Sequence, residues 1–218
     1  MTYRLVVLTN GRDCLRETLA AFRELADPQP AEVHVVVDGG ESAALDLAER
    51  RSGDPWHVHR IIPAIGFCRA TRWAWSMAAG PGPEFVFWLE DDIVLLRRVE
   101  LAHLADVLRR KPRLTQMALM RGPANDLEEA AGGCRALRPD DYVEGDGWHP
   151  WLESRTNHST GCSLIRRAFM EAEPWPKYDE NCEGRFSIDL LAKGYRFGVW
   201  GLGEPWVEHV GRRAGFGY

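Results

Sequence analysis

A chain of 218 residues, 45% of them hydrophobic, is long enough to bury the core of one large α/β domain. Its 27 basic and 32 acidic residues give a net charge of -5, which excludes the overall positive field of a general nucleic-acid-binding protein. The chain enters a strand-like segment without a signal peptide, and no apolar run approaches the length of a membrane span. We therefore expect a cytoplasmic protein without a transmembrane segment.

Strand-like and helix-like segments alternate through the first half of the chain. Runs of β-branched and apolar residues predict strands at 3–9, 32–38, 58–64 and 85–89. Apolar residues at helical spacing predict helices at 15–26, 42–51, 66–79 and 99–110. This alternation predicts a mostly parallel central sheet that is covered by helices on both faces.

The regular pattern breaks after a further predicted strand at 115–122. Residues 122 to 160 are rich in Gly, Pro, Asp and Trp, which predicts a long loop that is either functional or disordered. Regular structure then resumes with segment 162–172, a helix near 183–193 and a strand at 195–200. Neither a repeat nor a linker interrupts the sequence, so we predict a single domain with a nucleotide-binding half, 1–98, and an acceptor-binding half, 99–218.

The cysteines are odd in number, and none forms a C-x-x-C pair that would indicate zinc binding or thiol exchange. The five positions are Cys14, Cys68, Cys134, Cys162 and Cys182. We expect reduced, structural thiols. A nucleophilic role for Cys182 is disfavoured because neighbouring carboxylates oppose the formation of a thiolate.

Acidic residues follow two of the predicted strands. Asp38 ends the second strand, and Glu90, Asp91 and Asp92 lie between two apolar runs. Ligands of open α/β sheets bind beyond the carboxyl ends of strands, although acids in such turns are often only solvated. Because burying unpaired carboxylates is costly, the triplet predicts a hard divalent cation. Strand alternation predicts Glu90 and Asp92 on one side and Asp91 on the other.

An ordered series of motifs resembles the GT-A glycosyltransferases, in particular those of the family 2 type, over nearly the whole chain. The motifs are VVLTNGR, VVVDGG, GFCRATRWAWSMAAG, FWLEDDIVL, TGCSLIRRAFME, CEGRFSIDLLAKGYRFGV and EHVG. Each is weak alone, and their correct order carries the resemblance. It implies a GT-A fold and transfer of a sugar from a nucleotide-diphosphate donor, with UDP-sugars favoured, to an unknown acceptor such as a glycan, protein, lipid or modified base.

The resemblance also implies roles for individual residues. Donor binding falls on Thr9, Asn10, Arg12, Asp38, Arg69, Arg72, Glu90 and Asp91. Asp92 and His209 would ligate the metal, for which an imidazole beside carboxylates favours Mn²⁺ over Mg²⁺. The acidic pair that usually opens the late helix reads Cys182-Glu183, so Glu183 alone would be the catalytic base of an inverting reaction, with Glu180 as a competitor. Its place at a helix start is expected to favour the ionised form.

Each role has a structural alternative. Arg69 and Arg72 would serve equally well as solvated residues, and a lone histidine such as His209 is more often structural than a ligand. Trp148 and Trp151 would stack on an acceptor sugar or anchor their loop on the core. Arg212 and Arg213, in the glycine-rich tail, would close a lid over the donor diphosphate or lie in a solvated terminus.

Two other functional classes stay open from sequence. A catalytically silent sugar- or nucleotide-binding module would share the scaffold, but the acids, the base and the histidine are all present. A metal-dependent nucleotidyltransferase would share the acidic site. That class requires a glycine-rich phosphate loop after the first strand, where TNGRDCL has a single glycine.

Overall fold

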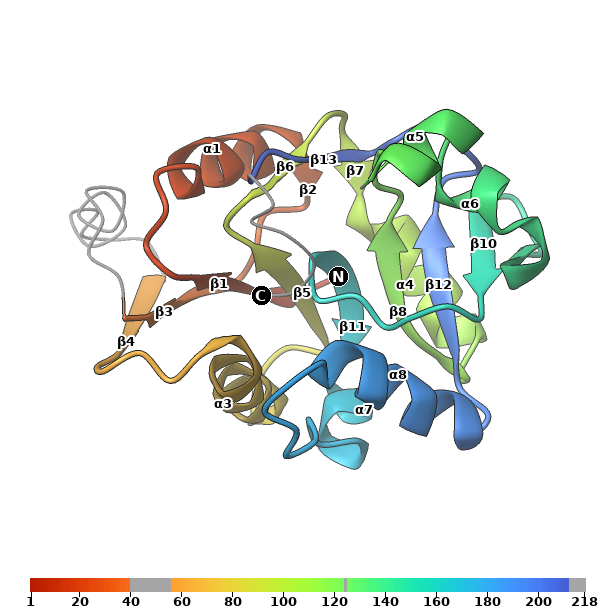
Figure 1. Ribbon diagram of the computed structural model, residues 1–218. Coiled ribbons are helices and arrows are strands. Elements are labelled where there is room, and N and C mark those ends of the chain that lie inside the picture. The colour runs from red at the N-terminus through yellow and green to blue at the C-terminus, as the bar shows by residue number, and fades with distance from the viewer. Residues whose placement is uncertain (40–55, 124, 212–218) are drawn as a thin grey trace.

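The computed structural model describes residues 1–39, 56–123 and 125–211. In these ranges one nine-stranded sheet runs through the molecule in the order β4-β3-β1-β5-β11-β8-β12-β10-β9 (Figure 1). Its strands are β1 (Tyr3–Thr9), β3 (Glu32–Asp38), β4 (Trp56–Ile61), β5 (Phe85–Glu90), β8 (Leu114–Leu119), β9 (Tyr142–Glu144), β10 (Trp151–Ser154), β11 (Cys162–Arg166) and β12 (Arg196–Trp200). The predicted α/β fold with a large central sheet is confirmed.

The four neighbouring strands β4, β3, β1 and β5 form the parallel part of the sheet. β1 lies between β3 and β5, and Val7 is paired with Val35 on one side and with Leu89 on the other. Every residue of β1 is buried, as expected for a strand covered on both faces. Parallel pairing brings the carboxyl ends of β1, β3 and β5 to one edge of the sheet.

The rest of the sheet is mixed. β11 runs antiparallel to both β5 and β8, and β12 runs parallel to β8. β10 pairs antiparallel with β12, and β9 pairs antiparallel with β10 at the end of the sheet. The segment 122–160, predicted as a long loop, contains regular elements and supplies two of these strands. Its helices are α5 (Asp126–Ala131), α6 (Cys134–Leu137) and the 3-10 turn η1 (Pro139–Asp141). Short elements escape sequence patterns because few residues carry the periodicity.

Helices cover both faces of the sheet, as the alternating pattern predicted (Figure 1). One face packs against α3 (Phe67–Ala79), α7 (Arg167–Ala172) and α8 (Cys182–Ala192), and the other against α1 (Leu15–Leu25) and α4 (Leu101–Arg110). The predicted helix 42–51 lies outside the described residues. No helix in the described part of the chain has the length and apolar composition to cross a bilayer.

Two small ribbons complete the fold. β2 (Ala26–Asp27) pairs with β7 (Val99–Glu100). β6 (Ile93–Leu95), which follows the acidic triplet, pairs antiparallel with β13 (Val207–His209) so that His209 lies opposite Ile93. The late histidine is therefore brought beside the acids, 117 residues earlier in the chain.

Candidate active site

A cleft of about 1050 Å³ opens at the carboxyl edge of β1, β3 and β5. Its walls come from the ends of these strands, the start of α3 and the start of α8. The lining includes most of the predicted donor-binding residues and both base candidates: Thr9, Asn10, Arg12, Asp38, Arg69, Glu90, Asp91, Glu180 and Glu183. Arg72 is half-buried and is not among the lining residues.

The acidic triplet divides at the end of β5. The strand ends at Glu90, and Asp91 and Asp92 form the turn before β6. The predicted alternation, with Glu90 and Asp92 on one side, is therefore wrong, because alternation holds only within an extended strand. Instead Asp91 and Asp92 both bond to Arg12, whereas Glu90 contacts the Thr160 hydroxyl. All three side chains are buried.

Asp91 is held by the first strand and its turn. It accepts hydrogen bonds from the Thr9 hydroxyl and the Arg12 guanidinium, and its own carbonyl accepts a bond of 2.7 Å from the Thr18 hydroxyl on α1. These contacts fix the turn after β5 against the turn after β1. A buried carboxylate is tolerated here because its charge is compensated by Arg12.

Asp92 bridges Arg12 and the late histidine. Its Oδ2 accepts a bond of 2.7 Å from Arg12 and lies 2.8 Å from His209 Nε2. Burial acts to raise the pKa of Asp92, but the hydrogen bond and charge of His209, together with Arg12, lower it below the ordinary value. Among the described residues its buried Oδ1 has no hydrogen-bond partner. An acceptor oxygen of this kind, beside an imidazole, fits a divalent metal ligand.

The chain after β13 covers Asp92 closely. The Val210 amide donates a bond of 2.9 Å to the Asp92 carbonyl. A Cβ at Gly211 would lie 2.1 Å from Asp92 Oδ2, so only glycine permits this approach. The predicted donor-binding residues Arg212 and Arg213, and with them the predicted lid, lie outside the described residues.

A second acidic group is built around Thr160, in the turn before β11. Glu183 Oε1 accepts bonds from the Thr160 amide at 2.8 Å and its hydroxyl at 2.6 Å. The same hydroxyl lies 2.6 Å from Glu90 Oε1. A hydroxyl has one proton to donate, so both short contacts are hydrogen bonds only if one carboxyl carries a proton. The Thr160 hydroxyl thus links the carboxyl groups of Glu90 and Glu183. The sequence motifs had placed Thr160 only in an acceptor-side segment.

Burial raises the pKa of Glu183 above its ordinary value, although the hydrogen bonds from Thr160 act in the opposite direction. The expectation that the helix start would favour the ionised form is therefore wrong, because the loss of hydration outweighs the helix dipole. A raised pKa makes the carboxylate a stronger base. Glu180, by contrast, is exposed at the rim of the cleft.

The nucleotide side of the cleft is shaped by Asp38 and the start of α3. Asp38 accepts bonds from the amides of Ile65 and Gly66, at 2.7 and 2.9 Å, and so fixes the loop before α3. Arg69 forms a two-point ion pair with Asp179, with N–O distances of 3.0 and 2.9 Å. The pair spans the cleft mouth between α3 and the loop before α8. Both Asp38 and Arg69 therefore have structural partners in addition to their place in the cleft.

A disulfide joins Cys68 of α3 to Cys182 of α8, directly before Glu183. The expectation that all five thiols are reduced is wrong for this pair, because the fold brings together two cysteines 114 residues apart. No local spacing signals such a pair. Cys14, Cys134 and Cys162 are free. The bridge ties the two walls of the cleft together.

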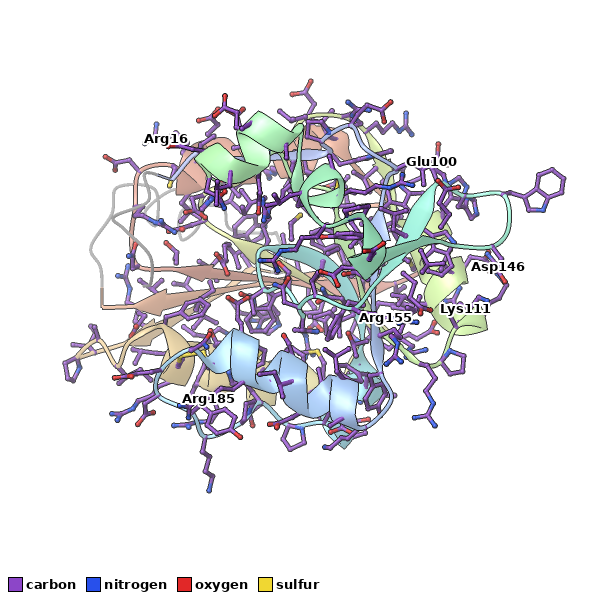
Figure 2. The ribbon with its side chains drawn as sticks, turned by 45° about the vertical axis from the view of Figure 1, so that its right-hand side comes forward. Arg16, Glu100, Lys111, Asp146, Arg155 and Arg185 are labelled. Carbon is purple, nitrogen blue, oxygen red and sulfur yellow. A yellow bond between two sulfur atoms is a disulfide. The ribbon has the colours of Figure 1, made fainter. Side chains whose placement is uncertain are left out.

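The two loop tryptophans have different environments. Trp151 is 2% exposed and belongs to the core, where its indole donates a bond of 3.1 Å to the Asp146 carbonyl. Its predicted acceptor role is wrong, since a buried ring offers no face to a sugar. Trp148 is 99% exposed. Its loop is fastened to α4 by an ion pair of 2.6 Å between Lys111 and Asp146, which point toward one another in Figure 2.

Neither a protein-family model nor a curated protein sequence matches the chain. Solved structures match over its whole length. GalNAc-T7 with UDP, GalNAc and Mn²⁺ is similar to 100% of the chain, with a TM-score of 0.69 and 13% identity. S. aureus TarS in complex with UDP-GlcNAc matches 99% of the chain, with a TM-score of 0.65 and 14% identity. The mannosyltransferase PcManGT from Pyrobaculum calidifontis, with GDP-Man and Mn²⁺, matches 98%, also with a TM-score of 0.65 and 14% identity.

This likeness defines the fold class. The chain has the GT-A fold of these three glycosyltransferases, as its ordered motifs predicted. It spans 45%, 60% and 58% of the lengths of the matched chains, so it corresponds to about half of each.

Proposed function

We propose that this chain is a metal-dependent, inverting glycosyltransferase that moves a sugar from a nucleotide-diphosphate donor to an acceptor hydroxyl. The observation that carries the proposal is that two kinds of carboxylate meet at this edge of the sheet: Glu183 lines the cleft, and Asp92 is buried beside Asp91 and bonded to Arg12, both of which line it. Asp92, with a lowered pKa, is paired with His209, and Glu183, with a raised pKa, is held by Thr160. Sugar transfer needs both an anionic metal site and a general base.

Asp92 and His209 are the proposed metal ligands. The Asp92 Oδ1 atom, buried and without a hydrogen-bond partner among the described residues, supports this assignment. The ligand set of one carboxylate and one imidazole favours Mn²⁺ over Mg²⁺. When bound, the metal neutralises the diphosphate oxygens and stabilises their departing charge. Arg12 already bonds to Asp92, so the cation and Arg12 compete for this carboxylate.

The donor is proposed to lie with its nucleoside against the first half of the chain, 1–98. Asp38 ends β3 beside the α3 loop, in the position expected to meet the base, and Thr9, Asn10 and Arg12 line the same cleft. Two of the matched structures contain UDP or a UDP-sugar and one contains GDP-Man, which favours a UDP-sugar here. The second half, 99–218, would bind the acceptor; exposed Trp148 does not line the cleft, so it would contact only a part of the acceptor that extends past α4.

Glu183 is the proposed base. The acceptor oxygen attacks the anomeric carbon from the face opposite the diphosphate, the bond to the diphosphate oxygen breaks, and the acceptor proton passes to Glu183. A single displacement inverts the configuration at that carbon. Thr160 orients the carboxylate through two hydrogen bonds to the same oxygen, Oε1.

The test is incubation with a panel of UDP-, GDP- and dTDP-sugars in Mn²⁺ or Mg²⁺, with release of nucleoside diphosphate as the readout. We expect release from one donor class, faster in Mn²⁺, and an NMR spectrum of the product with inverted anomeric configuration. Donor binding without release, with every acceptor class tried, would favour the silent binding module. Formation of a nucleotide sugar and pyrophosphate from a sugar phosphate and a nucleoside triphosphate would favour the nucleotidyltransferase.

A cytoplasmic location also remains a proposal. Disulfides persist mainly in oxidising compartments, so the redox state of Cys68 and Cys182 in the cell is informative. Alkylation of free thiols in freshly lysed cells, followed by mass spectrometry, would detect this bridge. A reduced pair would support the cytoplasmic location, and an oxidised pair would contradict it.

A further inference from the structure

The opposite end of the outer parallel strands has a cluster of imidazoles that takes no part in the proposed transfer. Glu32 and His34 lie on β3, and His57 and His59 on β4. The pairing of these strands places His34 directly opposite His57. Residues two apart on a strand share a face, so all four side chains lie on one face of the sheet.

The ligand atoms of three of these residues already lie close together. One atom each from Glu32, His34 and His57 falls within 4.8 Å of the other two, which makes the only group of this kind among the described residues. Ligand atoms at about 2.0–2.2 Å from a tetrahedral zinc ion are about 3.4 Å from one another, so side-chain rotations that bring these atoms about 1 Å closer complete the site. The strand pairing, rather than a mobile loop, sets the spacing.

His34 has an orphan nitrogen aimed into the group. The side chain is 9% exposed, and its Nε2 has no hydrogen-bond partner within the described ranges. That nitrogen lies 3.5 Å from Glu32 Oε2. When Nδ1 carries the proton, the Nε2 lone pair faces this carboxylate oxygen, and a cation between the two atoms would bind both.

The surrounding contacts orient the ligands as in known metal sites. His34 Nδ1 lies 2.9 Å from His59 Nε2, which leaves Nε2 of His34 for a metal when Nδ1 donates. Arg4 bonds to Glu32 Oε1 at 2.6 Å and leaves Oε2 facing His34. A ligating carboxylate is commonly fixed in this way by a second hydrogen bond.

We propose that Glu32, His34 and His57 form a second divalent-metal site that binds Zn²⁺ or a similar borderline metal. Two imidazoles and one carboxylate are a known ligand set for zinc, with solvent in the fourth position because His57 is exposed. His34 lies four residues before Asp38, about 13 Å along the strand from the cleft at 3.3 Å per residue. The metal joins the edge strand β4 to β3 and so stabilises the sheet beside the donor site.

The experiment uses the full chain with Asp92→Asn, which removes the proposed donor-site ligand, stripped with a chelator for the titration and reloaded with excess Zn²⁺ and desalted for the zinc content. Zinc content is measured by elemental mass spectrometry and zinc affinity by titration calorimetry. We expect one equivalent of Zn²⁺ and an increase in Tm on zinc addition, because a ligand of the native state stabilises it. Adding His57→Ala should weaken zinc binding at least tenfold and abolish the Tm increase.

Two further variants sharpen the result. His59→Phe keeps an aromatic ring but removes the nitrogen beside His34, and we expect about 10- to 100-fold weaker binding, the usual loss for a residue that orients a ligand. His103→Ala is the control, since His103 is an exposed histidine of α4 that pairs with Glu100, the residue before the helix. The absence of stoichiometric zinc in the Asp92→Asn protein, or equal affinity with and without His57, would overturn the proposal. Because Asp92 is absent throughout, neither result depends on the transferase assignment.

Discussion

Asp92 lies beside the cleft and Glu183 lies in it, and their surroundings drive their protonation in opposite directions. Asp91 and Asp92 lie beside Arg12, and Asp92 also contacts His209. Glu183 is linked to Glu90 through the Thr160 hydroxyl. The pKa of Asp92 is lowered by its cationic partners against the effect of burial, and burial raises the pKa of Glu183.

This contrast supports the tasks proposed for Asp92 and Glu183. A carboxylate that stays ionised is a suitable ligand for a metal and diphosphate, whereas a carboxylate with a raised pKa is a suitable proton acceptor. Glu90 and Asp91 are neighbours in sequence but have different partners: Asp91 bonds to Arg12, and Glu90 contacts Thr160. Four substitutions each change one feature of this contrast.

The largest expected effect is that of Glu183→Gln. The amide keeps the shape and the bonds to Thr160 but accepts no proton, so we expect transfer to fall by about 10²- to 10⁴-fold. Donor affinity, measured by calorimetry, should be unchanged. Glu180→Gln is the matched control, exposed at the same cleft, and should retain transfer. The reverse pattern would assign the base to Glu180.

Asp92→Asn should be next in size. The substitution removes the charge that holds the metal and leaves Arg12 and His209 facing a neutral group, so transfer in Mn²⁺ should fall by about 10²- to 10³-fold, with weaker donor binding. Asp106→Asn, an exposed residue paired with Arg110 on α4, is the control. Wild-type turnover of Asp92→Asn across a Mn²⁺ titration would disprove the metal assignment.

Gly211→Ala tests the close cover over Asp92. The added Cβ would lie 2.1 Å from Asp92 Oδ2, and this buried carboxylate cannot move without losing Arg12 or His209. We expect transfer to fall by about tenfold or more, because small displacements of reacting groups are costly. Gly203→Ala is the control, since a Cβ there meets no atom within 4 Å. Equal rates for the two variants would mean that Asp92 tolerates displacement.

Thr160→Val should have the smallest effect on the transfer rate, and the effect should be a change in the pH dependence of that rate. The Thr160 hydrogen bonds lower the pKa of Glu183, so loss of the hydroxyl raises that pKa further. A base works only when deprotonated, and the acid limb of the rate profile should therefore move to higher pH. Thr156→Val, in the same loop, should leave the limb in place. A shift to lower pH would show that Thr160 does not stabilise the Glu183 anion.

Much of the parallel half of the fold could be predicted from sequence. The strands at Tyr3–Thr9, Glu32–Asp38 and Phe85–Glu90 are long apolar runs, and their alternation with helices favours parallel pairing with acids at one edge. Glu90, Asp91, Asp92 and Asp38 could therefore be placed at the carboxyl edge of the sheet without any knowledge of contacts. The antiparallel strands β9 and β10 could not, because each has only three or four residues.

The sequence by itself determined which residues are available: the acids at strand ends, the late histidine, and a glutamate at a helix start. Only the tertiary structure decided how they are combined. Thr160 meets Glu183 across 23 residues, Cys68 meets Cys182 across 114, and His34 meets His57 through strand pairing. Local periodicity reports only whether a residue faces the core. The partner it meets there, and hence its pKa, depends on long-range packing that no short segment encodes.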